Sequence, residues 1–323
     1  MSVGRLTEVE QRLLLTAAVA APSVHNTQPW LFAVRDNRID LIADTSRQLH
    51  GQDSDGRALT ISCGAALLNL RVAAEHLGYQ PEVQLLPDDG QPDLLARVVF
   101  GGQHTHAGMA TELFTAIDLR RTNRQPYEDR PVPRSVLDAL VEAARQEGAE
   151  LHTLSDPQDR RRLVELIHEA DLDQETNPVR LDEAARWTGV DSDRSDGVPT
   201  ESLGPLPSTA ATPFRDLTLG RSIPGRHFAV FEADPTLAVL TTRHDDRAAW
   251  LVTGQALERV LLVATVEGVV STYANQPLEE PSLRWLVRDP DAPIGFAQMI
   301  MRLGYASPAP PTPRRPVDDV IVS

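Results

Sequence analysis

Two long apolar segments of this sequence, residues 56–77 and 246–267, align with each other at an offset of 190 residues. Each has the length and apolar content of a buried helix and ends at a glycine suited to a left-handed cap. The order hairpin, helix, glycine and strand is predicted twice, over 30–86 and 228–273, which favours two copies of one structural unit. Alanine, leucine and glycine also recur in unrelated buried helices, so chance similarity remains the alternative. The coinciding residues are Gly64, Ala66, Leu67, Ala74 and Gly78 in the first segment and Gly254, Ala256, Leu257, Ala264 and Gly268 in the second.

The rest of the chain alternates between helical and strand-like patterns, with one long interruption. Residues 188–226 are rich in Gly, Pro, Ser, Thr and Asp and show no sustained period. A segment of this length is usually a lid, a binding segment or a disordered linker. Further helices are predicted over 7–20, 111–119, 133–146 and 158–170, and strands over 30–34, 39–43, 83–86, 95–100, 150–154, 228–232, 236–242, 269–273 and 296–303.

Charge and cysteine content exclude several classes of protein. Acidic residues outnumber basic ones by 46 to 31, and the net charge of −15 disfavours a general binder of nucleic acid or of an anionic membrane. All the cations are arginine, which excludes lysine Schiff-base chemistry and a Walker-type phosphate lysine. The single cysteine, Cys63, and the absence of a secretory signal favour the cytoplasm. The apolar window 251–270 contains Glu258, Arg259 and Glu267, so we expect a buried helix there rather than a membrane span.

The common catalytic motifs are absent from the sequence. It contains no Gly-x-Ser-x-Gly, His-Glu-x-x-His, Cys-x-x-Cys or Gly-x-Gly-x-x-Gly. His104 and His106 lie in a glycine-flanked segment without a carboxylate or thiol at ligand spacing, which favours a solvated loop over a metal site. No catalytic metal is therefore expected.

A polar turn between two prolines is the first candidate binding motif. Residues 21–30 read Ala-Pro-Ser-Val-His-Asn-Thr-Gln-Pro-Trp and join the first predicted helix to the first strand. Because proline restricts the backbone, the polar groups between the two prolines can be positioned to bind a flat polar ligand. A turn that only caps the helix end is the alternative.

A cluster of arginines is the second candidate. Residues 119–127 read Leu-Arg-Arg-Thr-Asn-Arg-Gln-Pro-Tyr and follow a predicted helix. Guanidinium groups match phosphate oxygens in a bidentate way, and the hydroxyl adds a donor, so the segment suits a phosphomonoester. A solvated cationic face is the alternative reading of such a charge run.

Together the two motifs resemble the nitroreductase family of flavoproteins. In that family an Arg-Arg-Ser-x-Arg segment holds the phosphate and pyrimidine edge of FMN, and an Ala-Pro-Ser-x-x-Asn-x-Gln-Pro-Trp turn lies on the flavin. Residues 21–30 match the turn, and 120–124 match the arginine motif with threonine in place of serine. The segment 268–273 resembles the family's flavin-edge strand, and 314–316 its C-terminal phosphate arginine. Only 188–226 lies outside the resemblance.

The order of the motifs departs from the ordinary family pattern, in which the arginines precede the turn and two subunits share each flavin. Here the first repeat carries the turn and the second the arginines, while residues 143–148 stand where a second turn would be. The resemblance, which is greatest to the Acg-type branch, therefore implies an α+β nitroreductase-like fold. Two tandem repeats, each a small mainly antiparallel sheet packed with helices, would form an intrachain pseudo-dimer with one FMN site. The expected parts are a first repeat over 1–105, a second repeat over 106–187 and 227–323, and a lid-like insertion over 188–226.

The resemblance also implies an activity. Hydride would pass from NAD(P)H through FMN to a nitroaromatic or a quinone, and no residue of the chain is assigned as catalytic. The implied FMN contacts are Arg120, Arg121, Thr122, Arg314 and Arg315 to the phosphate, Arg124 to the pyrimidine edge, and Ser23, His25, Asn26, Tyr273, Ala274 and Asn275 to the ring. Gln28 of the turn is a further implied FMN-binding residue.

A protein that stores or sequesters FMN is the alternative function, because an insertion resting over the flavin would block nicotinamide. Spaced apolar residues favour such a lid over a disordered connector. In either case FMN is the expected partner, and a reductase would also bind NAD(P)H and a small aromatic acceptor. The chain is expected to be a monomer or a weak homodimer. The spaced apolar residues are Trp187, Val198, Leu203, Leu206, Phe214 and Leu217.

Overall fold

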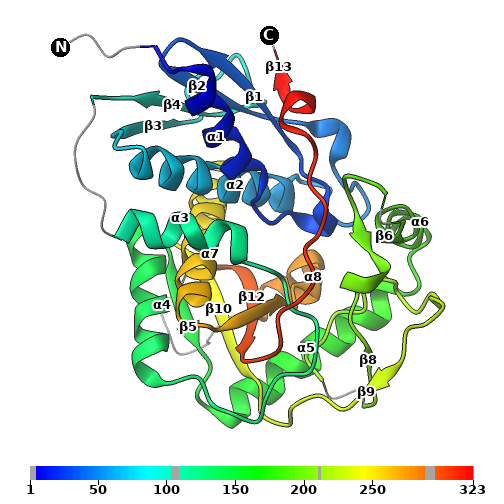
Figure 1. The fold of residues 1–323 in the computed structure, drawn as a ribbon. Helices are drawn as coiled ribbons and strands as arrows, with labels where there is room; N and C mark the ends of the chain where they lie inside the picture. The colour runs from blue at the N-terminus through cyan, green and yellow to red at the C-terminus, as the bar shows by residue number, and fades with distance from the viewer. Residues whose placement is uncertain (1–4, 103–108, 192, 210–211, 288–294, 323) are drawn as a thin grey trace.

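The computed structural model describes residues 5–102, 109–191, 193–209, 212–287 and 295–322. Two sheets with helices between them form the body of the molecule (Figure 1). The first sheet has the order β13-β1-β2-β4-β3 and the second the order β11-β12-β10-β5, which together with the helices give the expected α+β class. The strands are β1 (Trp30–Arg35), β2 (Arg38–Ala43), β3 (Pro81–Leu85), β4 (Leu94–Phe100), β5 (Glu150–Thr153), β10 (Thr236–Thr242), β11 (Val270–Tyr273), β12 (Phe296–Gly304) and β13 (Ile321–Val322).

The two sheets repeat one arrangement of antiparallel neighbours. The order β1-β2-β4-β3 in the first sheet corresponds to β5-β10-β12-β11 in the second. A helix precedes the first strand of each set, α1 (Glu8–Val19) or α4 (Arg134–Gln146). A twenty-residue helix follows the second strand, α2 (Arg57–His76) or α7 (Arg247–Val266). The apolar segments that align in the sequence are therefore topologically equivalent helices.

The predicted hairpin between 228–232 and 236–242 is wrong. Only Phe228–Ala229 forms a strand, β9, and it pairs with β8 (Leu206–Pro207). The neighbours of β10 are β12 and β5, so the counterpart of the β1–β2 hairpin is β5–β10. Antiparallel neighbours do not need a short connection, and here the connection is a large excursion that runs from 154 to 235. Local strand propensity alone suggested the nearer partner.

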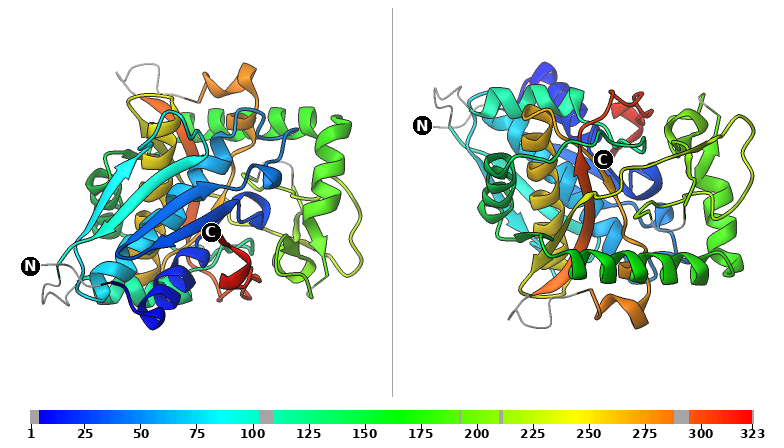
Figure 2. Two further views of the ribbon diagram at one scale, coloured as in Figure 1. Left: turned by 90° about the horizontal axis from the view of Figure 1, so that it is seen from above. Right: turned by 90° about the horizontal axis from the view of Figure 1, so that it is seen from below.

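That excursion forms the flank of the molecule in both views of Figure 2. Its two helices begin with good local signals, because Asp156 and Asn177 cap them and a proline follows each cap. Within it, the segment 188–226 supplies short strands instead of sustained structure. The elements are α5 (Pro157–Gln174), α6 (Pro178–Trp187), β6 (Thr188–Val190) and β7 (Val198–Pro199), followed by β8 and β9.

Helices α2 and α7 pack against each other at the centre through a reciprocal glycine contact. A methyl group added to Gly64 would lie 2.4 Å from the Leu251 carbonyl oxygen, and one added to Gly254 would lie 2.0 Å from the Ile61 carbonyl oxygen. At the offset of 190 residues Gly64 corresponds to Gly254 and Ile61 to Leu251. Equivalent residues thus meet each other, as they do across a two-fold axis.

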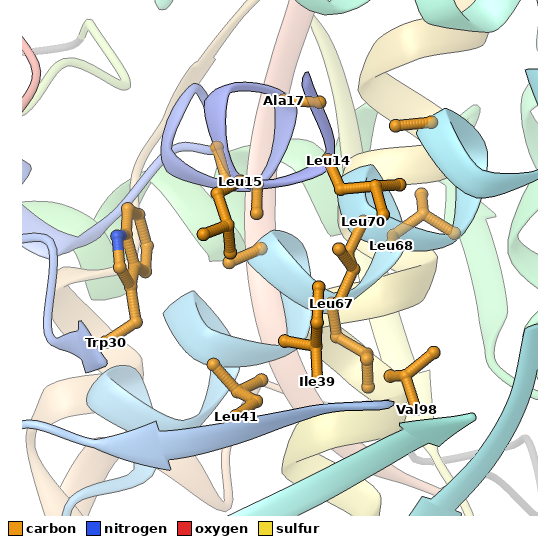
Figure 3. Packing of buried hydrophobic residues seen from close by; sticks show 14 of the residues in the cluster. Leu14, Leu15, Ala17, Trp30, Ile39, Leu41, Leu67, Leu68, Leu70 and Val98 are labelled. Atoms are coloured by element: carbon orange, nitrogen blue, oxygen red, sulfur yellow. The ribbon is translucent and has the colours of Figure 1, made fainter. Parts of the chain in front are cut away.

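The C-terminal segment crosses from the second sheet to the first (Figure 1). After β12 the chain runs past the turn at 21–30, and β13 pairs in parallel with β1. Behind that pairing, α1 and α2 pack on the sheet through Leu15, Leu67 and Ile39, which are fully buried (Figure 3). The second sheet therefore reaches the first repeat through covalent chain as well as through α7.

The two remaining helices are α3 (Met109–Leu119), which contacts both α2 and α7, and the short α8 (Pro281–Arg284). By length and composition α2 and α7 could each span a membrane, but 83% and 72% of their apolar windows are buried inside the protein. Such burial is typical of core helices. No group of three potential metal-ligating side chains occurs in the described ranges, and His104 and His106 lie outside them.

Candidate functional site

A cavity of about 100 Å³ is lined by residues from widely separated parts of the chain. Its wall combines the polar turn, the first half of α2, the arginine motif, β11 and two insertion residues, Arg215 and Leu217. Six of the residues that sequence analysis selected line it, and they come from segments far apart in the chain. These are Ser23, His25, Thr122, Arg124, Tyr273 and Asn275.

The turn holds its residues in an unusual backbone conformation. His25, Asn26 and Gln28 have φ values of 45°, 55° and 50°, in the left-handed region that side-chain-bearing residues rarely adopt. Ser23 supports the turn, because its hydroxyl accepts a hydrogen bond of 2.9 Å from the Gln28 amide. Such local strain of roughly 1–3 kcal/mol per residue tends to persist at binding sites.

His25 is buried, and neither of its ring nitrogens has a hydrogen-bond partner among the described residues. Burial, together with the nearby charges of Arg215 and Arg124, lowers the pKa of the imidazole well below its ordinary value. His25 is therefore neutral at physiological pH and presents one donor and one acceptor to the cavity.

Asn26 and Gln28 bind other parts of the protein. The Asn26 amide group donates to the carbonyl oxygens of Gly197 and Pro313. Gln28 donates to the Ser195 carbonyl oxygen at 2.8 Å and accepts the Arg315 amide at 2.7 Å. Both side chains tie the turn to the insertion and the C-terminal segment, and neither lines the cavity.

Arg120, Arg121 and Arg314 form a cationic cluster in which Arg120 is buried and the other two are half-buried. Arg120 and Arg314 both donate to the Ala20 carbonyl oxygen, and Arg121 donates to that of Arg120. Burial and then the proximity of Arg120 lower the pKa of both Arg121 and Arg314, the latter to about 9. The nearest compensating charge is Glu258 on α7, whose carboxylate lies 3.5 Å from Arg120 Nε. Arg120 Nε and Arg314 Nε have no hydrogen-bond partner in the part of the chain that the structure describes. Positive charge therefore exceeds negative charge here, which suits an anion.

The two C-terminal arginines point to different places. Arg314 joins the cationic cluster, where it also donates to the Asn26 side chain at 3.1 Å. Arg315 instead donates to the Gln28 carbonyl oxygen at 3.1 Å and to the Asp319 carbonyl oxygen at 2.9 Å. Arg315 thus fastens the C-terminal segment, and the structure does not bring it together with the other predicted phosphate ligands.

Arg124 lies between the cavity and the insertion. Burial lowers its pKa to about 10, and its guanidinium donates to the Ser202 carbonyl oxygen at 2.9 Å. Gly204, with a φ of 71°, packs so closely that an added methyl group would lie 2.4 Å from the Arg124 carbonyl oxygen. The insertion therefore lies directly on the arginine motif.

Strand β11 and the residues that follow it line the same cavity as the turn. Tyr273 is held by β11 at the cavity, and burial raises its pKa to about 12. Ala274 is buried and donates its amide to Ile300, while the Asn275 side chain accepts the Ile300 amide at 2.8 Å. Ala274 does not line the cavity, but it fixes the positions of its two neighbours.

Sequence reasoning missed the polar residues that the insertion and α2 bring to the cavity. Arg215 forms a two-pronged ion pair with Glu279, and both residues line the cavity together with Gln52 and Arg57. Arg57 donates to the backbone carbonyl oxygens of Gln298 and Leu278. None of these residues belongs to a local motif, so only their spatial convergence identifies them.

The insertion has a small apolar core of its own. Val198, Leu203 and Leu217 form a small buried cluster, and Phe214 lies against Phe231 with ring centroids 5.2 Å apart. Of the six predicted anchors, Trp187 is also buried and Leu206 is partly buried.

The family model and the relatives found by sequence agree on one family. A model of the nitroreductase family matches residues 117–305. Rv3131 of Mycobacterium tuberculosis H37Rv, provisionally named an NAD(P)H nitroreductase, is 36% identical over 96% of this chain and 90% of its own length. Acg of the same organism, named in the same way, is 31% identical over 94% of this chain and 92% of its own length. A nitroreductase with bound FMN from Bacteroides fragilis covers 61% of this chain and 89% of its own, with 16% identity and a TM-score of 0.38.

Proposed function

Because the chain belongs to the nitroreductase family, we propose that it is an FMN-dependent oxidoreductase that accepts electrons from NAD(P)H and reduces nitroaromatics or quinones. The observation that carries the proposal is the convergence of unpartnered buried polar groups on one cavity and the adjoining cationic cluster. When bound, FMN would supply the hydride transfer. The protein would supply binding, orientation and charge.

The cationic cluster fits the phosphate of FMN. Arg120 Nε and Arg314 Nε are buried donors without a hydrogen-bond acceptor in the described structure, although Arg120 Nε lies 3.5 Å from the Glu258 carboxylate. Arg121 adds a third charge beside them. A buried donor left without an acceptor costs about 1–3 kcal/mol, which a phosphate oxygen would remove. We assign the phosphate to these three arginines and to Thr122, and we assign Arg315 to the attachment of the C-terminal segment.

The cavity fits the flavin ring in chemistry, although it must widen. Ser23 and His25 would contact the ring from the first repeat, Tyr273 and Asn275 from the second, and Arg124 at the pyrimidine edge. A volume of about 100 Å³ is below the roughly 300–1,000 Å³ typical of ligand pockets. The insertion supplies part of the wall, so we expect it to shift when the ring enters.

We also propose that the chain is an intrachain pseudo-dimer with a single site. The matching strand orders and the reciprocal glycine contact support the pseudo-dimer. At the offset of 190 residues Ala65 in the cavity wall corresponds to Gln255, which accepts a 2.8 Å hydrogen bond from Arg71. Arg71 and Arg259 both bind Glu147, from the segment that replaces the second turn. An ion-pair network thus fills the place of a second site.

Storage of FMN is the second candidate, and one observation favours it. Arg215 and Leu217 of the insertion form part of the cavity wall, and the ion pair of Arg215 with Glu279 fastens the insertion there. A closed insertion would exclude nicotinamide from the ring. A mobile one would gate turnover.

Steady-state oxidation of NADPH by purified flavin-loaded protein, with 4-nitrobenzoate or a benzoquinone as acceptor, decides between the two. We expect turnover that exceeds that of free FMN at equal concentration and is lost in flavin-depleted protein. Bound flavin that dithionite reduces and that neither NADPH nor NADH reduces would reject the reductase and support storage. A protein that binds no FMN would reject both.

A further inference from the structure

Apart from Thr122, the residues that line the cavity are separate from the cationic cluster assigned to the phosphate. Arg120, Arg121 and Arg314 do not line the cavity, whereas Arg215 and Glu279 do. If FMN binds as proposed, the wall at Arg215 and Glu279 faces whatever lies beside the ring. The charges and hydrogen-bonding groups of this wall should therefore indicate which class of molecule binds beside the flavin as the second ligand.

The wall is positively charged in an acidic protein. Among the residues that line the cavity, Arg57, Arg124 and Arg215 are cationic and Glu279 is the single carboxylate, so the lining carries a formal charge of +2. The whole chain carries −15. A cationic pocket in an anionic protein attracts anions locally.

Arg215 is held rigidly in this wall. The Glu279 carboxylate accepts hydrogen bonds from both terminal nitrogens of the Arg215 guanidinium. It also accepts hydrogen bonds from the side chains of Gln52 at 3.0 Å and Gln174 at 3.2 Å. Four donors from the insertion, the first repeat and α5 therefore converge on one carboxylate. The guanidinium is oriented before any ligand arrives, which lowers the entropic cost of binding.

Two groups of the wall remain without partners. Arg215 Nε is buried and has no acceptor, and both ring nitrogens of His25 are likewise unpartnered in the described structure. The Arg215 side chain is only 10% exposed. Both Arg215 and His25 line the same cavity of about 100 Å³.

We propose that Arg215 and His25 form a subsite for a negatively charged oxygen, so that the preferred second ligand is a small aromatic carboxylate or phenolate. The proposal rests on the proposed function and adds to it the class of ligand. Arg215 Nε would donate to the anionic oxygen, and His25 would donate through one ring nitrogen. Neutral aromatics of equal size would lack the charge that this wall complements.

Binding of 4-nitrobenzoate and of its neutral near-isostere 4-nitrobenzamide to flavin-loaded protein tests the proposal. Affinities are measured by calorimetry and by the change in flavin absorbance. We expect the anion to bind at least tenfold more tightly, because a hydrogen bond to a charged group is stronger than one to a neutral group. Arg215→Gln should abolish that preference and keep FMN. Arg194→Gln, an insertion variant whose side chain is 40% exposed, should leave the preference unchanged.

Arg215→Gln leaves Glu279 without its charged partner, so the double variant Arg215→Gln/Glu279→Gln is measured beside it. It should also lose the anion preference. Equal affinities of wild-type protein for the two ligands would overturn the proposal, as would an unchanged preference in both variants. Loss of FMN with no anion preference would assign Arg215 to the flavin instead. If the protein carries no FMN, the proposed function fails, while calorimetry with the same ligands still tests the subsite.

Discussion

At the scale of single residues, the proposed phosphate site makes a testable prediction for Arg120. Arg120→Ala removes one unpartnered donor and one charge from the cluster. A charge-assisted hydrogen bond contributes roughly 1.5–3 kcal/mol, so FMN should bind about tenfold to a hundredfold more weakly. Riboflavin, which lacks the phosphate, should bind almost as before. Fluorescence titration with both ligands measures the difference.

Arg120→Ala also leaves Glu258 buried without its cation. The double variant Arg120→Ala/Glu258→Gln removes that complication and should show the same selectivity for riboflavin over FMN. Equal weakening of both flavins in the two variants would place Arg120 away from the phosphate.

The buried carboxyl group of Glu258 leads to a second prediction at the residue scale, which concerns how the stability of the fold depends on pH. Burial raises its pKa from 4.5 to about 7 despite the nearby Arg120. The folded protein then retains a proton that the unfolded chain has lost, so this stabilising contribution is complete below about pH 4.5 and disappears as the pH rises through 7. Urea unfolding of flavin-free protein should show stability falling across this window, with a smaller fall in Glu258→Gln.

The fall should not vanish in Glu258→Gln. Asp171 has a pKa raised to about 7, also mainly by burial, and contributes with the same sign. An identical pH dependence in wild-type protein and Glu258→Gln would show that Glu258 is not protonated in the folded state.

At the scale of elements, the α2–α7 contact is where the two repeats meet. Gly64→Ala would place a methyl group 2.4 Å from a backbone carbonyl oxygen, and neither helix can move without disturbing its own sheet. We expect a loss of about 1–3 kcal/mol or more in the free energy of unfolding, measured by urea denaturation. Gly102→Ala is the matched control, since an added methyl there has no atom within 4 Å. Equal stability of the two variants would contradict the close packing.

The insertion is the second element with a testable role. Its whole deletion would also remove the carbonyl groups of Ser195 and Gly197 that hold the turn, so a point variant is sharper. Leu203→Ala should loosen the buried cluster with Val198 and Leu217 and speed the reduction of bound flavin by dithionite, with FMN content unchanged. Leu206→Ala, outside that cluster, should not. Equal rates in stopped-flow measurements would reject the role of a lid.

At the scale of the whole molecule, the proposed pseudo-dimer would draw different halves of one site from its two repeats. The turn comes from the first repeat and the arginine motif from the second, and Glu147 with its arginines occupies the equivalent second place. Extracted flavin should therefore approach one equivalent per chain, measured against protein concentration. Two equivalents would show that the second place also binds FMN.

The sequence by itself determined the family, the α+β class and most helices and strands, and it singled out two of the segments that contribute residues to the candidate cavity. Those features depend on local patterns: apolar periodicity, capping residues, and polar motifs such as 21–30 and 120–124. The match of α2 with α7 was also visible, because equivalent helices that meet through their backbones need glycine at the same position.

Tertiary structure alone decided which neighbour each group meets. In the folded chain β10 pairs with β5, which precedes it by some eighty residues. Arg314 lies in the cationic cluster, whereas Arg315 contacts the turn. Asn26 and Gln28 donate hydrogen bonds to the insertion. Tertiary structure also brought Arg215 and Glu279 to the cavity. Adjacent arginines have the same local chemistry, so the sequence cannot distinguish their contacts. The strand propensity of a segment likewise does not indicate which other strand it pairs with. Only the long-range packing of the chain distinguishes these outcomes.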